Sequence, residues 1–432
     1  MEDRTAGARA YRLARGLVAP TEFGLLWTAT TLSQLAVRVG GIALSLLAVT
    51  AMAATPVQMG LLTSAQHLGM LIVGLPAGAM IDRYARRRMM ARMDGVRAAL
   101  VAGVALAWWT GVLTWPLLLA SALAASVASV FFDVAQQAYL PSVVARTQLV
   151  RANTRLQGTS SVLALGGSAA GGVLVSLLSA AGTVFAGAVG YFASALTLRF
   201  MHGDDPLPSA ARTGMAAEIR AGFGYVWRDR ALRAIALCTA SGNFFMSAFI
   251  AVMLLFLVRD LHIPVYAAGL VVAGAGIGGV VAAATTKRWV DRFGQARTVV
   301  LSLALTQPFA LLTPLSAPGW RIALFITGWF VTGYGSTLYN ISQVSYRQAV
   351  CPDELLGRVN ASNRFLAFAT PAVGALLGGV LADVTSPRTT LLIAAAGLVL
   401  GVGWLVASPL AQQPQPTLVD GVEGIGSARG LS

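Results

Sequence analysis

Apolar stretches of roughly 20 residues recur along the whole chain, and short polar connections separate them. A helix of that length crosses the hydrocarbon core of a bilayer, which is about 30 Å thick. The pattern predicts an all-α membrane protein with twelve spanning helices, at residues 23–50, 57–80, 91–113, 116–139, 155–180, 183–200, 232–258, 265–286, 297–315, 319–343, 362–383 and 388–408.

The longest connection between apolar stretches separates the sixth predicted span from the seventh. It divides the chain into an N-terminal six-helix half at residues 1–200, a cytoplasmic central loop at 201–231 and a C-terminal six-helix half at 232–408. Residues 409–432 lack apolar periodicity, so we expect a disordered cytoplasmic tail there.

The two halves also repeat in sequence. Residues 153–172 align without a gap with residues 360–379, which pairs Gly167 with Gly374, Gly171 with Gly378 and Gly172 with Gly379. A second match pairs Asp82-Arg83 with Asp291-Arg292 at an offset of 209 residues. Related six-helix halves are a feature of secondary transporters, so the repeat favours a transporter.

Composition supports the membrane assignment. The chain is 56% hydrophobic and 11% charged, with a mean hydropathy of +0.71, whereas an ordinary soluble domain carries about 25% charged residues. The net charge of +14 would suit a nucleic-acid partner, but the positions of the charges exclude one. Basic residues gather in alternate connections, at Arg4–Arg15, Arg83–Arg92, Arg146–Arg155, Arg199–Arg233, Lys287–Arg297 and Arg347–Arg364.

This alternation is the positive-inside pattern of membrane proteins. It predicts a multi-pass protein of the cell inner membrane with both termini in the cytoplasm. The expected partners of the basic connections are therefore the anionic headgroups of the inner leaflet of the lipid bilayer.

The connection between the second and third predicted spans carries a motif. Its sequence, Gly78-Ala-Met-Ile-Asp82-Arg83-Tyr-Ala85-Arg86-Arg87-Arg88, is similar to the GxxxD(R/K)xG(R/K)(R/K) loop of the major facilitator superfamily. Ala85 occupies a position where the family has a glycine that tolerates a positive φ, so we expect the turn to differ here. The resemblance implies a gating loop that closes the cytoplasmic side, formed by Gly78, Asp82, Arg83, Arg86 and Arg87. The alternative is that these arginines only set the topology.

Within that superfamily the chain resembles the twelve-span exporters that include macrolide and siderophore efflux proteins. The fifth predicted span carries Gly167, Gly171 and Gly172, which partly match the GPxxGG signature of drug and proton antiporters. Ser168 stands at the proline position of that signature, and small residues permit close helix packing whatever the direction of transport. The resemblance implies the major facilitator fold and a working monomer.

Four predicted spans, the first, fourth, seventh and tenth, place polar residues at the spacing of one helix face. The same four spans line the central cavity in the family that the chain resembles. The candidate cavity residues are Thr30, Gln34, Arg38, Ser129, Asp133, Gln137, Asn243, Tyr339, Asn340 and Gln343. The alternative for any one of them is a hydrogen bond between helices.

Ionisable residues inside the predicted spans are few, and an arginine there marks a site. We expect Arg38 to attract an anionic group of the substrate, and the alternative is that it bonds to helix carbonyls. Proton coupling needs a buried carboxylate or histidine. Asp133 is the preferred candidate, and His67 and Glu22 are the others.

Asp94 and Arg97 form a further charged pair, at the cytoplasmic end of the third predicted span. They are three residues apart and therefore share one helix face. We expect a structural ion pair between them.

Sequence motifs for catalysis are absent from the chain. It contains no GxxxxGK(S/T) phosphate loop, HExxH motif, CxxC pair or nucleophile elbow. We therefore expect neither an enzyme nor a bound metal or cofactor. The predicted function is export of a small amphipathic molecule, such as a drug, antibiotic or siderophore-like compound, in exchange for protons by alternating access. The alternatives are an importer or uniporter of the same fold and a non-transporting membrane sensor.

Overall fold

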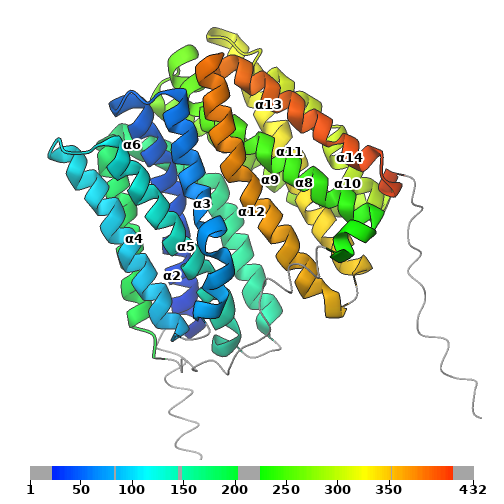
Figure 1. Cartoon of the computed structure of the whole chain (residues 1–432), viewed down its shortest axis with the longest axis horizontal. Helices are drawn as coiled ribbons and strands as arrows, with labels where there is room; N and C mark the ends of the chain where they lie inside the picture. Colours follow the sequence, from blue (N-terminus) through cyan, green and yellow to red (C-terminus); the bar gives the residue numbers. More distant parts are fainter. Residues whose placement is uncertain (1–21, 82–83, 145–147, 203–223, 352, 412–432) are drawn as a thin grey trace, which may run out of the picture.

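The computed structural model describes residues 22–81, 84–144, 148–202, 224–351 and 353–411, and helices make up most of this part of the chain (Figure 1). No β-strand occurs among these residues. The predicted all-α fold is therefore confirmed.

The N-terminal half is built from long helices. They are α2 (Glu22–Leu46), α3 (Pro56–Ile81), α4 (Arg86–Trp109), α5 (Trp115–Val143) and α6 (Leu149–Arg199). A π-helical turn, η1 (Leu47–Ala51), extends α2. Helix α6 covers two predicted spans, and the non-helical backbone of Ser179, at φ 68° and ψ 168°, separates them.

The C-terminal half has the same general plan with more interruptions. Its helices are α8 (Arg230–Leu255), α9 (Val265–Phe293), α10 (Gln295–Ala304), α11 (Ile322–Val350), α12 (Asp353–Val384), α13 (Pro387–Gly401) and α14 (Gly403–Val406). A π-helical turn, η3 (Phe256–Asp260), extends α8. The 3₁₀ turns are η4 (Gln307–Leu312), η5 (Gly319–Arg321) and η6 (Pro409–Ala411).

Each predicted span overlaps a helix of the structure. By length and hydropathy, six helical segments of the described chain can cross a membrane: Glu22–Ala51, Trp115–Val143, Ala170–Arg199, Arg230–Asp260, Val265–Phe293 and Pro387–Val406. The membrane crossing of the other predicted spans remains a prediction.

Two expectations from the sequence need correction. The span predicted at 297–315 is not one helix, because α10 ends at Ala304 and the chain continues as η4. Pro308 lies in that turn, and a proline ring clashes with the carbonyl four residues earlier and so stops an α-helix. The tail is also predicted to start at residue 409, but residues 409–411 form η6, in which Leu410 is fully buried against the C-terminal half. Residues 412–432 lie outside the described chain.

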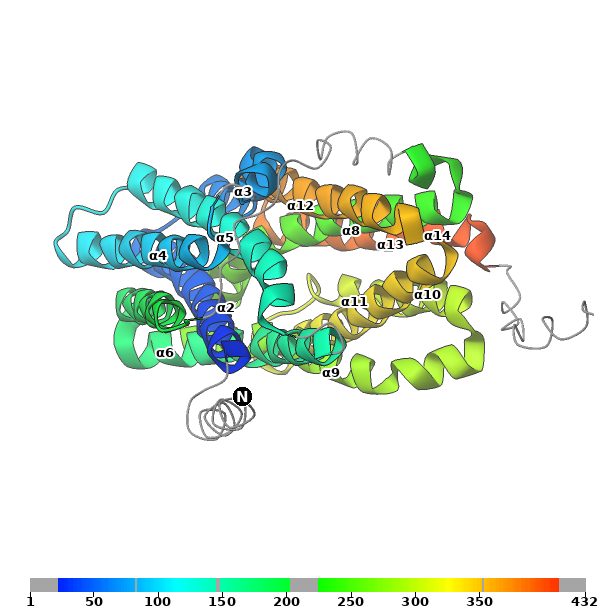
Figure 2. The same ribbon diagram turned by 90° about the horizontal axis from the view of Figure 1, so that it is seen from below.

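The bundle has two chemically different ends. The end where α4 begins and α6 finishes carries most of the described basic residues, and we call it the basic end. The opposite end contains the tight connections α2–α3, α4–α5, α8–α9 and α12–α13, and we call it the short-loop end. Seen from the basic end, the two halves lie side by side, with α3 next to α12 and α6 next to α9 (Figure 2).

The repeat seen in the sequence is also present in the backbone. Both η1 and η3 are five-residue π-helical turns, and they occupy equivalent positions of the two halves. Ala53 and His262, which follow them, both adopt a positive φ, of 50° and 52°, although neither is glycine. The two residues are related by the same offset that relates Asp82 to Asp291. The halves therefore end their first helices in the same way.

The turn before α4 differs from its counterpart before α10, as Ala85 led us to expect. Gly294 adopts φ 80° and ψ 162°, which is a conformation that side chains disfavour. Ala85 instead adopts φ −58° and ψ 115°. An alanine at this position therefore changes the path of the chain into α4.

Close glycine contacts join the two halves near the short-loop end. A Cβ atom added to Gly172 of α6 would lie 2.7 Å from Cα of Gly269 in α9, and one added to Gly379 of α12 would lie 2.7 Å from Cα of Gly60 in α3. Only glycine permits such an approach of two backbones. Arg259 adds a bond between the halves, since its Nη2 donates to the carbonyl of Val49 over 3.0 Å.

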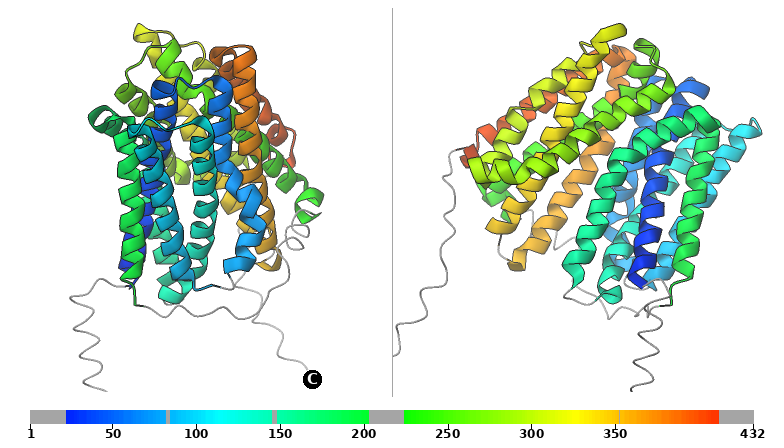
Figure 3. Two further views of the ribbon diagram at one scale, coloured as in Figure 1. Left: turned by 60° about the vertical axis from the view of Figure 1, so that its left-hand side comes forward. Right: turned by 180° about the vertical axis from the view of Figure 1, so that it is seen from behind.

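The clusters of buried apolar residues also differ between the two ends of the bundle. The largest cluster contains residues from both halves, among them Leu46, Leu62, Phe249 and Leu255. At the basic end each half has a cluster of its own, around Phe132 in the N-terminal half and Val299 in the C-terminal half. The halves converge at the short-loop end and diverge towards the basic end (Figure 3).

We predict that Gly374→Leu destabilises the protein, because a Cβ at this position would lie 2.1 Å from the carbonyl oxygen of Phe244. Overpacking of this kind typically costs about 1–3 kcal/mol. Gly103→Leu is the matched control, since a Cβ there has no neighbour within 4 Å. Thermal unfolding of the purified protein, followed by tryptophan fluorescence, should show a lower midpoint for Gly374→Leu alone. Equal midpoints for both variants would contradict the predicted packing.

Candidate functional site

The helices that carry the predicted polar residues are α2 and α5 in one half and α8 and α11 in the other. The main contacts between the halves are made by other helices, through α3 with α12 and α6 with α9, and α8 adds a smaller contact with α3. The polar helices therefore supply only a small part of the contact between the two halves.

Besides Ser129, which is half-buried and bonded to Arg97, six of the ten candidate cavity residues are exposed or half-buried. Arg38, Asp133, Gln137 and Asn340 are exposed, and Gln34 and Asn243 are half-buried. Charged and amide side chains inside membrane helices normally face the bundle interior or a water-filled cavity, because lipid cannot solvate them. We call these six residues the polar set, and they define the candidate site.

Arg38 and Asp133 lie at different heights in the bundle. At 1.5 Å per residue, Arg38 lies about 24 Å along α2 from the basic end, whereas Asp133 lies about 15 Å along α5 from that end. Helix α6 positions Arg38, since a Cβ added to Gly167 would lie 2.6 Å from Cβ of Arg38. The site therefore presents a positive group deeper in the bundle than its carboxylate.

Two other candidates in the N-terminal half are a buried residue, Thr30, and a half-buried residue, Ser129, that bonds to another helix. Thr30 is 2% exposed, and Ser129 accepts a hydrogen bond from Nη1 of Arg97 over 3.2 Å. Ser129 also donates to the carbonyl of Ala125 over 2.9 Å. Ser129 therefore makes a polar contact between α4 and α5, and its place in a substrate cavity stays a prediction.

The two remaining candidates, in the C-terminal half, are also buried. Tyr339 is 5% exposed, and its hydroxyl lies 2.8 Å from Oγ1 of Thr239 and donates to the carbonyl of Ile235 over 3.2 Å. Gln343 is 6% exposed and accepts a hydrogen bond from Nη1 of Arg347. Tyr339 ties α11 to α8, whereas Gln343 bonds within its own helix.

Asp94 and Arg97 form the expected ion pair, fully inside the N-terminal half. The two side chains are at most 2% exposed. Asp94 also accepts hydrogen bonds from Ser33 of α2 at 3.2 Å and from Ser194 of α6 at 2.5 Å. The Arg97 guanidinium lies 4.5 Å from the ring centre of Phe132 in α5. This charged centre therefore connects α2, α4, α5 and α6. Spacing along the chain does not predict the contacts of Ser33 and Ser194, because their partner Asp94 lies on another helix.

The other proton-coupling candidates are distributed over the bundle. His67 is half-buried on α3. Glu22 begins α2 at the basic end, where one carboxylate oxygen accepts a hydrogen bond from the backbone N–H of His202 over 3.0 Å. Neither is part of the polar set, whereas Asp133 is.

The predicted gating residues do not all lie in a loop. Gly78 belongs to the last turns of α3, and Asp82 and Arg83 lie outside the described residues. Arg86 and Arg87 instead form the first turn of α4. Nη1 of Arg86 donates to the carbonyl of Ala138 over 2.8 Å, so this arginine braces α4 against α5.

Trp27, in the second turn of α2, is not among the site residues predicted from the polar pattern. Its indole Nε1 donates to Oγ1 of Thr159 in α6 over 2.9 Å, and the Arg155 guanidinium lies 5.9 Å from the ring centre. Trp27 is 36% exposed. It offers an aromatic surface on the same helix as Arg38.

Comparison with known proteins identifies the same architecture. A family model described as transmembrane secretion effector matches residues 17–418. The multidrug efflux pump Tap of Mycobacterium tuberculosis is 27% identical over 356 residues, which cover 79% of this chain and 83% of that protein. Tap of Mycolicibacterium fortuitum is 29% identical over 350 residues, covering 78% and 83%. An uncharacterized transporter of the major facilitator type, YfiS of Bacillus subtilis, is 24% identical over 405 residues, covering 90% and 93%.

Solved structures with the same fold share little sequence with this chain. A mutant of the nucleoside transporter NupG superposes with a TM-score of 0.73 at 14% identity, covering 90% of this chain and 99% of that one. A bacterial homologue of the iron transporter ferroportin, in an inward-facing state, superposes with a TM-score of 0.68 at 15% identity, covering 90% and 99%. These likenesses establish the major facilitator fold.

We predict that Asp94→Asn destabilises the protein strongly, because it leaves the buried Arg97 without its counter-ion. Removing one partner of a buried pair typically costs about 3–5 kcal/mol. The double variant Asp94→Asn/Arg97→Leu should recover part of the loss, since no charge stays buried.

The matched control is Lys287→Gln, which breaks the exposed pair between Lys287 and Asp291. Exposed ion pairs contribute little to stability, so this variant should unfold at the same temperature as the wild type. The midpoint of thermal unfolding in detergent compares the stability of all three variants with that of the wild type. An Asp94→Asn midpoint no lower than that of Lys287→Gln would refute the assigned role.

Proposed function

We propose that this chain, which belongs to the transmembrane secretion effector family of the major facilitator superfamily, exports a small amphipathic molecule by alternating access and exchanges it for protons. The two six-helix halves would rotate against each other around the polar set. The observation that carries the proposal is the asymmetry of the bundle. Its halves share a core at the short-loop end, and each has its own core at the basic end.

The basic end would face the cytoplasm, because positively charged connections remain on that side of a membrane. Both termini would then be cytoplasmic, and the protein would be a multi-pass protein of the bacterial inner membrane. In this orientation the present arrangement of the halves would correspond to an inward-facing state. Substrate would enter from the cytoplasm or the inner leaflet.

The chemistry of the polar set supports an amphipathic substrate. Arg38 supplies a positive charge, while Gln34, Asn243 and Asn340 supply amide donors and acceptors. Trp27 supplies a partly exposed apolar ring. The relatives named multidrug efflux pumps support a drug or antibiotic as the substrate class. A siderophore-like compound has the same mixture of polar and apolar groups.

Asp133 would couple transport to protons. It is exposed in the present conformation and lies on a helix that must change neighbours when the basic end closes. Burying a charged carboxylate is costly, so a carboxylate covered by this closure takes up a proton. An outward-facing state would load Asp133 with a proton, and the inward-facing state would release it.

Direct proton measurements test the mechanism. Purified protein in acid-inside liposomes that hold a pH-sensitive dye should alkalinise the lumen when an amphipathic compound is added. Asp133→Asn should abolish this signal, because an amide does not titrate. Asp291→Asn is the matched control, since Asp291 is an exposed carboxylate at the basic end, and it should behave as wild type. Transport of a labelled compound with no proton signal would support a uniporter instead.

Drug accumulation in cells tests the direction of transport. Expression should lower the accumulation of a compound that gives a proton signal, and Arg38→Ala should restore most of it. Increased accumulation on expression would indicate an importer. A cellular phenotype that persists unchanged in Arg38→Ala would favour a non-transporting sensor.

A further inference from the structure

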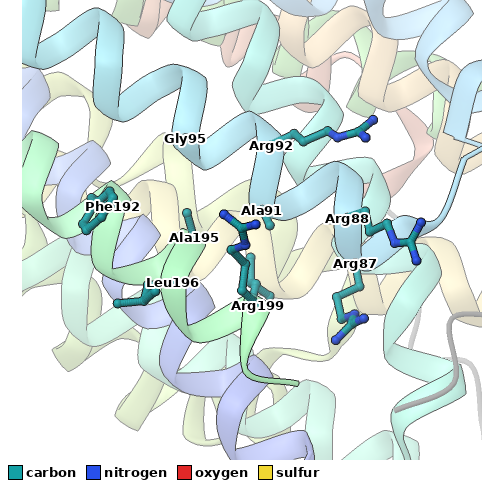
Figure 4. Close-up of a pocket in the computed structure, with 10 residues that line it drawn as sticks. Arg87, Arg88, Ala91, Arg92, Gly95, Phe192, Ala195, Leu196 and Arg199 are labelled. Atoms are coloured by element: carbon teal, nitrogen blue, oxygen red, sulfur yellow. The ribbon is translucent and has the colours of Figure 1, made fainter. Parts of the chain in front are cut away.

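A basic groove opens on the outer surface of the N-terminal half, away from the polar set. It has a volume of about 650 Å³ and lies between the first turns of α4 and the last turns of α6 (Figure 4). Its lining residues are Arg87, Arg88, Ala91, Arg92, Gly95, Phe192, Ala195, Leu196, Leu198 and Arg199. The proposed transport mechanism uses none of them, and only Arg87 is among the gating residues predicted from the sequence.

Two helix faces form the groove. Residues 88, 91, 92 and 95 of α4 follow the three- and four-residue spacing of one face, and residues 192, 195, 196 and 199 of α6 do the same. The small residues Ala91, Gly95 and Ala195 leave space between the helices. A Cβ added to Gly95 would meet no atom within 4 Å, which confirms that the space is open there.

The polar part of the groove is entirely positive. Four of the lining residues are arginines and none is acidic. The carboxylate nearest in sequence, Asp94, points away into the ion pair with Arg97. Arg88, Arg92 and Arg199 are exposed. An anion that binds here would therefore meet several guanidinium groups and no opposing carboxylate.

The remainder of the groove is apolar and accessible. Phe192 is 60% exposed and Leu196 is 43% exposed. Phe192 lies at one end of the groove and Arg87 and Arg88 lie towards the other (Figure 4). Because α6 ends at Arg199, Phe192 lies about 10 Å deeper in the bilayer than that arginine. The groove therefore changes from positive to apolar in the direction that leads from headgroups to acyl chains.

We propose that this groove binds an anionic phospholipid. The phosphate would contact Arg88, Arg92 and Arg199, and an acyl chain would lie along Phe192 and Leu196 over the small residues. A soluble phosphate would use only the arginines, so the apolar part of the groove distinguishes the two ligands. The bound lipid joins the start of α4 to the end of α6, and it stabilises the N-terminal half next to the connection that precedes α4.

Native mass spectrometry of the full-length protein in detergent tests the site, with phosphatidylglycerol as the probe and phosphatidylcholine as the neutral comparison. The wild type should retain phosphatidylglycerol in preference to phosphatidylcholine. The groove variant Arg88→Gln/Arg92→Gln/Arg199→Gln should lose roughly 100-fold in affinity, since each arginine near an anionic headgroup contributes about fivefold.

The charge-matched control is Arg288→Gln/Arg292→Gln/Arg297→Gln, which removes three exposed arginines from the same end of the C-terminal half. It should bind phosphatidylglycerol as the wild type does. Equal losses in the groove variant and this control would overturn the proposal, because the lipid would then respond only to overall charge.

Gly95→Leu separates a lipid site from a simple anion site. The added side chain fills the apolar part of the groove and leaves all four arginines in place, and leucine favours the helix more than glycine does. This variant should fold normally and lose phosphatidylglycerol binding. Wild-type lipid binding in Gly95→Leu, or displacement of the lipid by millimolar inorganic phosphate, would overturn the proposal.

Discussion

Close approach of glycine backbones at the short-loop end is the constraint on which the structure depends. Lipid gives helices no hydrophobic reason to associate, so association relies on close packing. Gly172 against Gly269 and Gly379 against Gly60 supply that packing at two equivalent places, and each contact crosses the boundary between the halves. Because both contacts lie near one end, the halves are joined there, and the proposed alternating access would open and close the other end.

The charged residues of the N-terminal half are divided between its buried interior and its exposed surface. Asp94 and Arg97 are buried inside the N-terminal half, where the hydrogen bonds of their ion pair join α2, α4 and α6. Arg38 and Asp133 remain exposed, although each costs free energy inside a membrane. Helices joined by a buried ion pair are expected to move together, which fits the proposed movement of whole halves better than movement of single helices.

The sequence predicted what depends on local spacing. Periodicity located the helices, and an i,i+3 separation identified the pair of Asp94 and Arg97. The repeat alignment identified Gly172 and Gly379 as equivalent, but it could not reveal Gly269 and Gly60 as their partners, because contacts between distant helices leave no periodic signal. The same limit explains Ser129 and Tyr339, for which a polar face did not distinguish a cavity from a neighbouring helix. It also explains the break after α10, where the apolar pattern continued through Pro308.

Pulsed electron paramagnetic resonance distances test the role of the glycine contacts most directly. Spin labels at Thr114 and Trp320 report on the short-loop end, and labels at Tyr84 and Arg297 report on the basic end; both native cysteines are buried. The account predicts that Gly172→Leu/Gly379→Leu lengthens the distance between Thr114 and Trp320 and shortens the distance between Tyr84 and Arg297. A folded variant in which both distances equal those of the wild type would contradict it.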